Sequence, residues 1–213
     1  MAPAGVIERL VDRARQLVPQ NGRVVLGITG SPGAGKSTLA RSLVDALDPQ
    51  GQWVVVVPLD GFHLANTTLA RLGRSDRKGA IDTFDAYGYL SALRRIRAET
   101  GRTVYLPAFD RALEESIAGE ITVDANIKLV VTEGNYLLAA ADPWPEVRRE
   151  MGEVWYLELD DAVRRERLVA RHVHFGRTEA EARRWVEEVD EVNARLIAAT
   201  RDSADLVVDV GQV

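Results

Sequence analysis

The sequence predicts an α/β domain in which a mostly parallel sheet carries helices on both faces. Short apolar runs alternate with helix-like stretches along the whole chain, as in such sheets. The apolar runs span residues 24–29, 53–58, 103–106, 127–132, 154–159 and 206–210. The composition is also that of a folded protein, because 46% of the 213 residues are hydrophobic and 28% are charged. We expect one domain that covers residues 1–213.

Two stretches show clear helix signals. The opening segment places apolar side chains on one face of a helix, and these are Ile7, Leu10, Val11, Ala14, Leu17 and Val18. Near the other end, Thr178 and Glu181 form a capping box. The apolar positions that follow are Trp185, Val189, Val192 and Leu196. The sequence therefore predicts an amphipathic helix on the sheet at the start of the chain and a long helix from about 179 to 199.

Composition excludes several classes of function. The chain has no cysteine, which rules out disulfides, thiolate metal sites and cysteine nucleophiles. Its net charge of -5 argues against a general nucleic-acid binder, which needs a strongly positive face. The apolar runs are too short to span a bilayer, and the first residues lack the order of a signal peptide. We expect a cytoplasmic protein without nucleic-acid or membrane partners; a homodimer is a further expectation.

The most specific motif follows the first apolar run. Residues 30–38 read Gly-Ser-Pro-Gly-Ala-Gly-Lys-Ser-Thr, which fits the phosphate-loop (P-loop, or Walker A) pattern G-x-x-x-x-G-K-[ST]. Backbone N–H groups of such a loop converge on phosphate oxygens at the positive end of the next helix. The residues expected to bind the nucleotide here are Gly30, Ser31, Gly33, Ala34, Gly35, Lys36, Ser37 and Thr38. Lys36 would reach the β and γ phosphates, and the Ser37 hydroxyl would bind magnesium.

Two further apolar runs end in acidic residues. Asp60 follows the run at 53–58, where a carboxylate can bind magnesium or take a proton from an attacking hydroxyl. The pair Asp60-Gly61 can also be a simple turn. Glu133 follows the run at 127–132, and an acid beside a phosphate loop commonly holds magnesium or its water shell. Ligands gather at the carboxyl ends of strands in α/β sheets, so we place the site at 30–38, 59–64, 107–111 and 133–136.

Polar and aromatic residues near these strand ends could form a pocket for a small hydroxylated molecule. The expected substrate-binding residues are Asp60, His63, Lys78, Phe84, Phe109, Arg111, Asn135 and Tyr136. The stretch 107–111 is read as a loop that breaks the preceding strand. Arg74, Arg77, Lys78 and Arg111 could converge near Asp60 and favour an acceptor with a carboxylate or phosphate. Alternatively, Arg74 and Arg77 are solvated and pair with Asp76 and Asp82.

An arginine-rich segment at about 164–178 leads into the capped helix. Arginine suits transferring phosphates because its charge is fixed and its guanidinium forms paired hydrogen bonds. Gly176 offers a hinge, so we expect a lid in which Arg171 and Arg177 contact the nucleotide. His172 and His174 have no third histidine or cysteine nearby, which favours a loop role over a metal site.

Taken together, these segments resemble the superfamily of phosphoribulokinases, uridine kinases and bacterial pantothenate kinases. The resemblance lies in residues 27–38, 59–63, 83–85, 107–111, 133–136 and 164–177. It is closest to a compact bacterial branch labelled nucleoside or nucleotide kinase-like, also called fructose transport system kinases. The resemblance implies a P-loop fold with a helical lid, ATP and Mg²⁺ as cofactors, Asp60 as base and Glu133 near the metal.

The sequence therefore predicts an ATP-dependent kinase that phosphorylates a hydroxyl of a small molecule. Lys36, Asp60 and Arg171 are the expected catalytic residues, and Ser37, Glu133 and Asp60 the expected metal ligands. Nucleosides, sugars and pantothenate-like molecules remain open as acceptors, and the preference between ATP and GTP is open too. The alternative function is a regulatory module that binds or hydrolyses ATP without a small-molecule acceptor.

Overall fold

The core of the molecule is a parallel sheet. The structure, a computed structural model, describes residues 4–212. Within them the sheet strands are β1 (Val24–Gly30), β2 (Val54–Val56), β5 (Leu129–Glu133), β6 (Glu153–Glu158) and β7 (Leu206–Asp209). They pair in parallel in the order β2-β5-β1-β6-β7, which puts β1 at the centre. The predicted α/β fold is confirmed.

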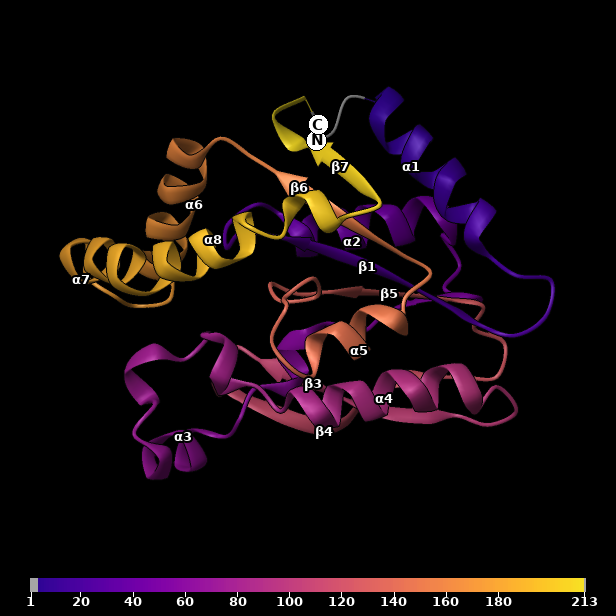
Figure 1. The fold of residues 1–213 in the computed structure, drawn as a ribbon, viewed down its shortest axis with the longest axis horizontal. Helices are drawn as coiled ribbons and strands as arrows, with labels where there is room; N and C mark the ends of the chain where they lie inside the picture. Colours follow the sequence, from indigo (N-terminus) through magenta and orange to yellow (C-terminus); the bar gives the residue numbers. More distant parts are fainter. Residues whose placement is uncertain (1–3, 213) are drawn as a thin grey trace.

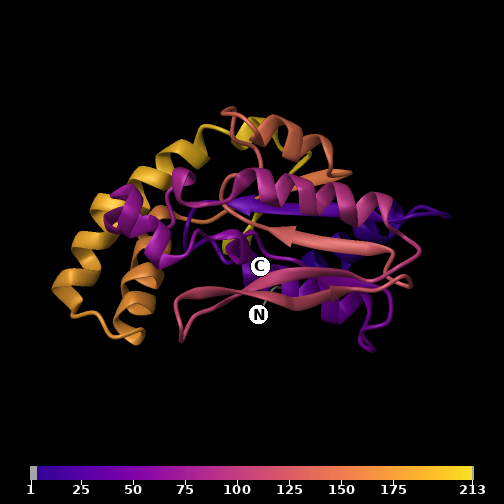
Figure 2. The ribbon, with the colours of Figure 1, turned by 90° about the horizontal axis from the view of Figure 1, so that it is seen from below.

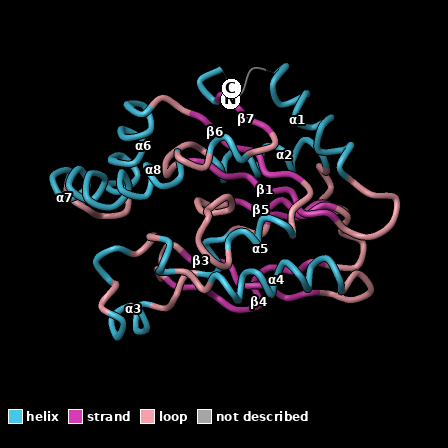
Figure 3. The backbone as a smooth tube through the Cα atoms, in the orientation of Figure 1, coloured by secondary structure: helices cyan, strands magenta, loops and turns pink. Residues whose placement is uncertain are grey.

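Helices cover both faces of this sheet (Figures 1 and 3). One face packs against α1 (Ala4–Leu17) and α2 (Lys36–Leu47), and the other against α4 (Ala86–Ala98) and α5 (Trp144–Arg149). The alternation of side chains along β1 divides the core in two. Leu26 and Ile28 face α1 and α2, whereas Val25, the residue before Leu26, belongs to the cluster on the α4 face. The amphipathic helix predicted at the start of the chain is confirmed.

The prediction for residues 103–111 is wrong in part. The apolar run at 103–106 does not join the main sheet but belongs to β3 (Val104–Asp110), which pairs antiparallel with β4 (Glu115–Val123) in a separate hairpin. The stretch 107–111, expected as a loop, continues β3 to Asp110 across a shift in register between Leu106 and Ala108. The irregular pairing interrupts the alternation from which a strand is recognised, and most of the hairpin is only half-buried.

The arginine-rich segment expected as a lid, about 164–178, lies in α6 (Asp161–His174) and the turn after it. The next elements are α7 (Glu179–Trp185), a π-helical turn at Val186–Asp190 and α8 (Glu191–Ala198). We call α6 and α7 the lid. Thr178 and Glu181 form the predicted capping box. The long helix is present, but its buried face is different from the predicted one. Val192 and Leu196 are exposed, while Asp190, Glu191 and Asn193 are buried. The buried face of this helix therefore combines these polar residues with Ala182, Val186, Ala194 and Ile197.

The sheet directs its carboxyl ends toward the lid. In Figure 2, β1 and β5 point toward the end where α6, α7 and α3 (Asn66–Leu72) lie. Among the described helices, none is both long and apolar enough to cross a lipid bilayer. Residues from the first and the second half of the chain thus lie together beyond the carboxyl ends of the strands, where α/β proteins bind their ligands.

Candidate functional site

The P-loop connects β1 to α2 at the centre of the sheet. Gly33 and Gly35 have φ of 82° and 95°, a region that glycine adopts without strain. A Cβ on Gly33 would also lie 2.9 Å from the carbonyl oxygen of Arg164 in α6. Lys36 Nζ donates to the carbonyl oxygens of Gly30 (2.8 Å) and Ser31 (3.2 Å). Burial lowers the pKa of Lys36 to about 8, although Glu133 and Asp60 partly oppose the shift.

Ser37 and Glu133 form the candidate magnesium site. Ser37 Oγ donates to Glu133 Oε1 over 2.8 Å. Glu133 is buried at the end of β5, and burial together with nearby Asp60 raises its pKa. No cluster of three or more acidic or histidine side chains in residues 4–212 could hold a metal alone. A hydroxyl and a carboxylate nevertheless suit Mg²⁺, which takes oxygen ligands and completes its shell with water and substrate phosphates.

Asp60 lies in a short 3-10 helix, Leu59–Phe62, in the segment that follows β2. Its Oδ2 accepts a hydrogen bond from Arg111 Nη2 over 2.8 Å, and both side chains are partly exposed. The packing of the β3-β4 hairpin explains the glycine at position 61. A Cβ at this position would lie 2.2 Å from the carbonyl oxygen of Pro107 in β3. Glycine therefore brings the hairpin, and Arg111 with it, close to Asp60.

Aromatic rings surround His63, which lies three residues after Asp60. Its imidazole stacks on Phe84 with ring centroids 4.0 Å apart and lies 5.0 Å from the ring of Phe109. Burial lowers the pKa of His63 to about 4, so the ring is neutral near pH 7. Its Nδ1 is buried and has no hydrogen-bond partner among the described residues. A neutral ring with one unused nitrogen is suited to a hydrogen bond with a bound molecule.

The basic residues near position 78 are tied to their surroundings. Arg77 pairs with Asp82 (2.9 Å) and Asp76 (3.3 Å), and Arg74 pairs with Asp82 (3.3 Å). Neither arginine lines the cavity described below. The alternative of solvated, paired arginines is confirmed for these two.

Lys78 lines the cavity, and its Nζ donates to Asn66 Oδ1 (2.7 Å) and to the carbonyl oxygen of Glu114 (2.6 Å). It also lies 5.0 Å from the centre of the Phe109 ring. Lys78 thus joins the segment after α3 to the tip of the β3-β4 hairpin.

The lid supplies the opposite side of the site. Arg177 Cζ lies over the ring of Trp185, 3.8 Å from its centre. The Nη1 of Arg177 is buried without a hydrogen-bond partner in the described structure. His172 and Asp190 join α6 to the π-helical turn through a 2.8 Å contact. Arg171 lines the cavity beside them.

One lid arginine has a different position. Arg164 is buried, binds Glu191 of α8 and donates from Nη1 to the carbonyl oxygen of Pro32 at 3.2 Å. This side chain therefore fastens the lid to the P-loop.

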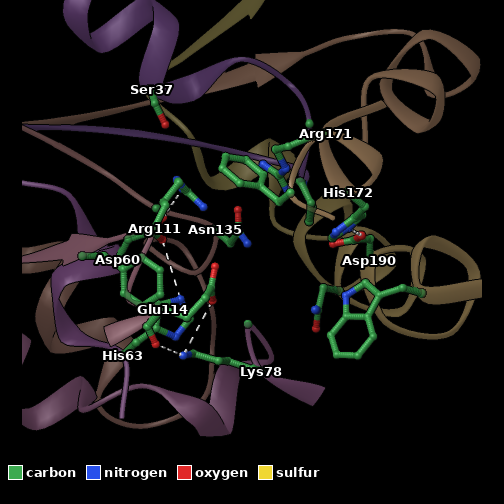
Figure 4. Close-up of a pocket in the computed structure, with 18 of the residues that line it drawn as sticks. Ser37, Asp60, His63, Lys78, Arg111, Glu114, Asn135, Arg171, His172 and Asp190 are labelled. Carbon is green, nitrogen blue, oxygen red and sulfur yellow. Dashed lines mark hydrogen bonds and ion pairs between the residues drawn. The ribbon is translucent and has the colours of Figure 1, made fainter. Parts of the chain in front are cut away.

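A cavity of about 420 Å³ brings these groups together. Figure 4 shows Asp60, His63, Lys78, Arg111 and Glu114 on one side and Arg171, His172 and Asp190 on the other. We call the first side, together with Phe84 and Phe109, the acceptor wall. The other predicted site residues that line the cavity are Gly33, Lys36, Ser37, Glu133, Asn135 and Arg177.

Some predicted site residues lie elsewhere. Tyr136 is buried in the core, where its hydroxyl donates to the carbonyl oxygen of Gly79 over 2.6 Å. The remaining P-loop residues lie outside the cavity lining, and these are Gly30, Ser31, Ala34 and Thr38. The structure adds Glu114, Trp185, Asp190 and Asn193, which sequence reasoning did not identify. For Asp190 and Asn193 the only signal in the sequence was that each is polar. The apolar pattern of their helix predicted a different buried face.

Comparison with known protein families identifies the nucleotide-binding part. The model of the family described as "Methylmalonyl Co-A mutase-associated GTPase MeaB" matches residues 8–66. This segment contains the P-loop and Asp60 but neither β5 nor the lid. The match is therefore to less than half of the chain.

Individual relatives match over a greater length. A protein of Schizosaccharomyces pombe named "Putative uridine kinase" is 32% identical over 209 residues, covering 94% of this chain and 89% of its own. The crystal structure of a "putative fructose transport system kinase" from Silicibacter sp. is 36% identical, with a TM-score of 0.87, and covers 95% of this chain and 98% of that one. Pantothenate kinase of Chelativorans sp. is 31% identical over 120 residues, covering 55% of this chain and 36% of the enzyme. The chain belongs to the superfamily of P-loop kinases that includes the uridine kinases, bacterial pantothenate kinases and phosphoribulokinase.

Proposed function

We propose that the chain transfers the γ-phosphoryl group of ATP to a hydroxyl of a small molecule, with Asp60 as base. One observation carries the proposal. Asp60 and Glu133, at the ends of the neighbouring strands β2 and β5, line one cavity with Lys36 and Ser37 of the P-loop. A nucleotide on the P-loop would thus present its last phosphate to a carboxylate that can accept a proton.

In this reaction the acceptor oxygen attacks the γ-phosphorus while the bond from phosphorus to the oxygen of ADP breaks. The hydroxyl proton passes to the carboxylate of Asp60, whose Oδ2 is bound to Arg111 in the empty site. Lys36 would turn from the carbonyl oxygens of the P-loop toward the phosphates. Magnesium, when bound at Ser37 and Glu133, would neutralise and orient the phosphate oxygens.

The lid arginines complete the proposal. Arg171 faces the cavity, and the buried Nη1 of Arg177 has no protein partner in the described structure, so both can bind phosphate oxygens. Their fixed positive charges would stabilise the charge that spreads over the transferring group. Trp185 would hold the Arg177 guanidinium against its ring while the phosphates are bound.

The test is ATP consumption in the presence of Mg²⁺ and single acceptors from a panel of nucleosides, sugars, sugar phosphates and hydroxy acids, repeated with GTP. We expect at least one acceptor to stimulate consumption and to be phosphorylated. Asp60→Asn should then lower the rate of transfer by roughly 100- to 10,000-fold while ATP still binds. Lys36→Ala should lose about 100-fold or more. Consumption that no acceptor stimulates would instead favour a regulatory ATP-binding module.

A further inference from the structure

We propose that the acceptor carries a carboxylate or phosphate near its reacting hydroxyl, and that Arg111 leaves Asp60 to bind this group when the acceptor enters. The inference rests on the proposed function, because Asp60 then marks where the reacting hydroxyl lies. Arg111 would bind the base Asp60 while the site is empty. It would bind the anionic group of the acceptor once the acceptor is present.

Arg111 has donors to spare. Its Nη2 binds Asp60 Oδ2 at 2.8 Å, and this is the side-chain hydrogen bond that Arg111 makes within residues 4–212. A guanidinium carries five N–H groups, so most of its donors have no protein partner within residues 4–212, and the side chain lines the cavity. Its Cζ also lies 5.9 Å from the centre of the Phe109 ring, which keeps the group on the acceptor wall. It can therefore form paired hydrogen bonds with an anion beside Asp60.

The other cations near Asp60 have partners of their own or, like Arg171 of the lid, are assigned to the nucleotide. Lys78 is bound to Asn66 and Glu114, and Arg77 to Asp82. Lys36 lies on the P-loop, where it would meet the nucleotide. His63 is neutral near pH 7 and offers a hydrogen bond but no charge. On the acceptor wall, Arg111 is thus the cation that can exchange its partner at low cost.

The ion pair between Arg111 and Asp60 is well placed for such an exchange. The side chains are 47% and 33% exposed, and an ion pair in contact with water contributes little stability. An anionic acceptor can therefore compete with Asp60 for the guanidinium. Its binding would leave both carboxylate oxygens available to the reacting hydroxyl. A neutral acceptor offers no replacement charge, so the pair would persist and hold one of the two oxygens.

The experiment compares acceptors that differ in one charged group. Suitable pairs are glycerate with glycerol, pantothenate with pantothenol, and fructose 6-phosphate with fructose, so that carboxylate and phosphate are tested separately. We expect kcat/KM to be at least about 10-fold higher for the anionic member of the pair that is used. Arg111→Ala should remove this preference by lowering kcat/KM for the anionic member alone. Arg183→Ala is the matched control, because Arg183 pairs with Glu179 on the exposed side of α7.

A binding measurement tests the exchange itself. Without Asp60 to compete, the Asp60→Asn variant should bind the anionic acceptor more tightly than the wild type, by about 3-fold or more in calorimetry with a non-hydrolysable ATP analogue. Removing a negative charge could raise affinity without Arg111, so the double variant Asp60→Asn, Arg111→Ala completes the cycle. We expect Asp60→Asn to bring no gain in affinity when Arg111 is already replaced by alanine. A gain of the same size in the double variant would overturn the exchange.

The two proposals fail in different ways. If neutral members react as well as anionic ones, or if Arg111→Ala lowers both equally, the chain remains a kinase but Arg111 only positions Asp60. If no acceptor in the panel stimulates ATP consumption, the proposed function fails and this inference fails with it. Thermal melting of each variant separates loss of fold from loss of binding.

Discussion

Ser37 donates a hydrogen bond to Glu133, with 2.8 Å between Oγ and Oε1. The contact follows from the order of the strands. Because β1 and β5 are neighbours, with Ile28 opposite Glu133, the helix that begins after β1 meets the carboxylate that ends β5. The order of the strands thus holds together the two side chains that we propose as magnesium ligands.

Replacing this hydroxyl should weaken the use of magnesium. In Ser37→Ala we expect the Mg²⁺ concentration for half-maximal rate to rise by about 10-fold or more. A magnesium titration of acceptor-dependent ATP consumption measures it. Ser42→Ala, an exposed hydroxyl on the same helix, is the control. An unchanged magnesium dependence in Ser37→Ala would remove Ser37 from the metal site.

If the lid binds the nucleotide, replacing two of its arginines should affect the rate of phosphoryl transfer differently. Arg171 lines the cavity, whereas Arg183 is 66% exposed and pairs with Glu179. Arg171→Ala should slow phosphoryl transfer by about 100-fold or more, because a charge near the transferring phosphate is lost. Arg183→Ala should leave the rate nearly unchanged. Single-turnover transfer measured in both variants decides, and equal rates would contradict a role of Arg171 at the phosphates.

The P-loop and the acids at the strand ends could be predicted from the sequence because each follows a continuous apolar run. In a parallel sheet the carboxyl ends of the strands lie at one edge, so the residues that follow them are expected close together without any other sequence signal. Asp60 and Glu133 were located in this way and do line one cavity.

The rest of the site depends on features without a local pattern. The hairpin was missed because the shift in register within β3 interrupts its alternation. Asp190 and Asn193 were missed because they are buried polar residues on α8 and the preceding π-helical turn. Such residues oppose the rule that buried helix faces are apolar. Their burial reflects the cavity that they line, which forms only when the lid meets the sheet.

At Gly61 the hairpin lies close to the segment that follows β2. Gly61→Ala would place a Cβ 2.2 Å from the carbonyl oxygen of Pro107, so the backbone must move. We expect a loss of about 1 to 3 kcal/mol in stability, which lowers Tm by roughly 5 °C in a domain of this size. Gly101→Ala, where a Cβ meets no atom within 4 Å, is the control. Equal melting temperatures for the two variants would contradict the close approach.

His63 predicts how stability depends on pH. Its pKa in the folded chain is about 4, below the usual histidine value of 6.5, because burial disfavours the charged ring. Between these two values the unfolded chain binds more protons, so His63 makes the free energy of unfolding fall as the pH falls from 6.5 toward 4. The slope is at most about 1.4 kcal/mol per pH unit. Denaturant unfolding of the wild type and of His63→Gln from pH 4.5 to 7.5 isolates this contribution, since other groups titrate in both proteins. The difference in stability between them should shift against the wild type at low pH, and a constant difference would show that His63 titrates alike in both states.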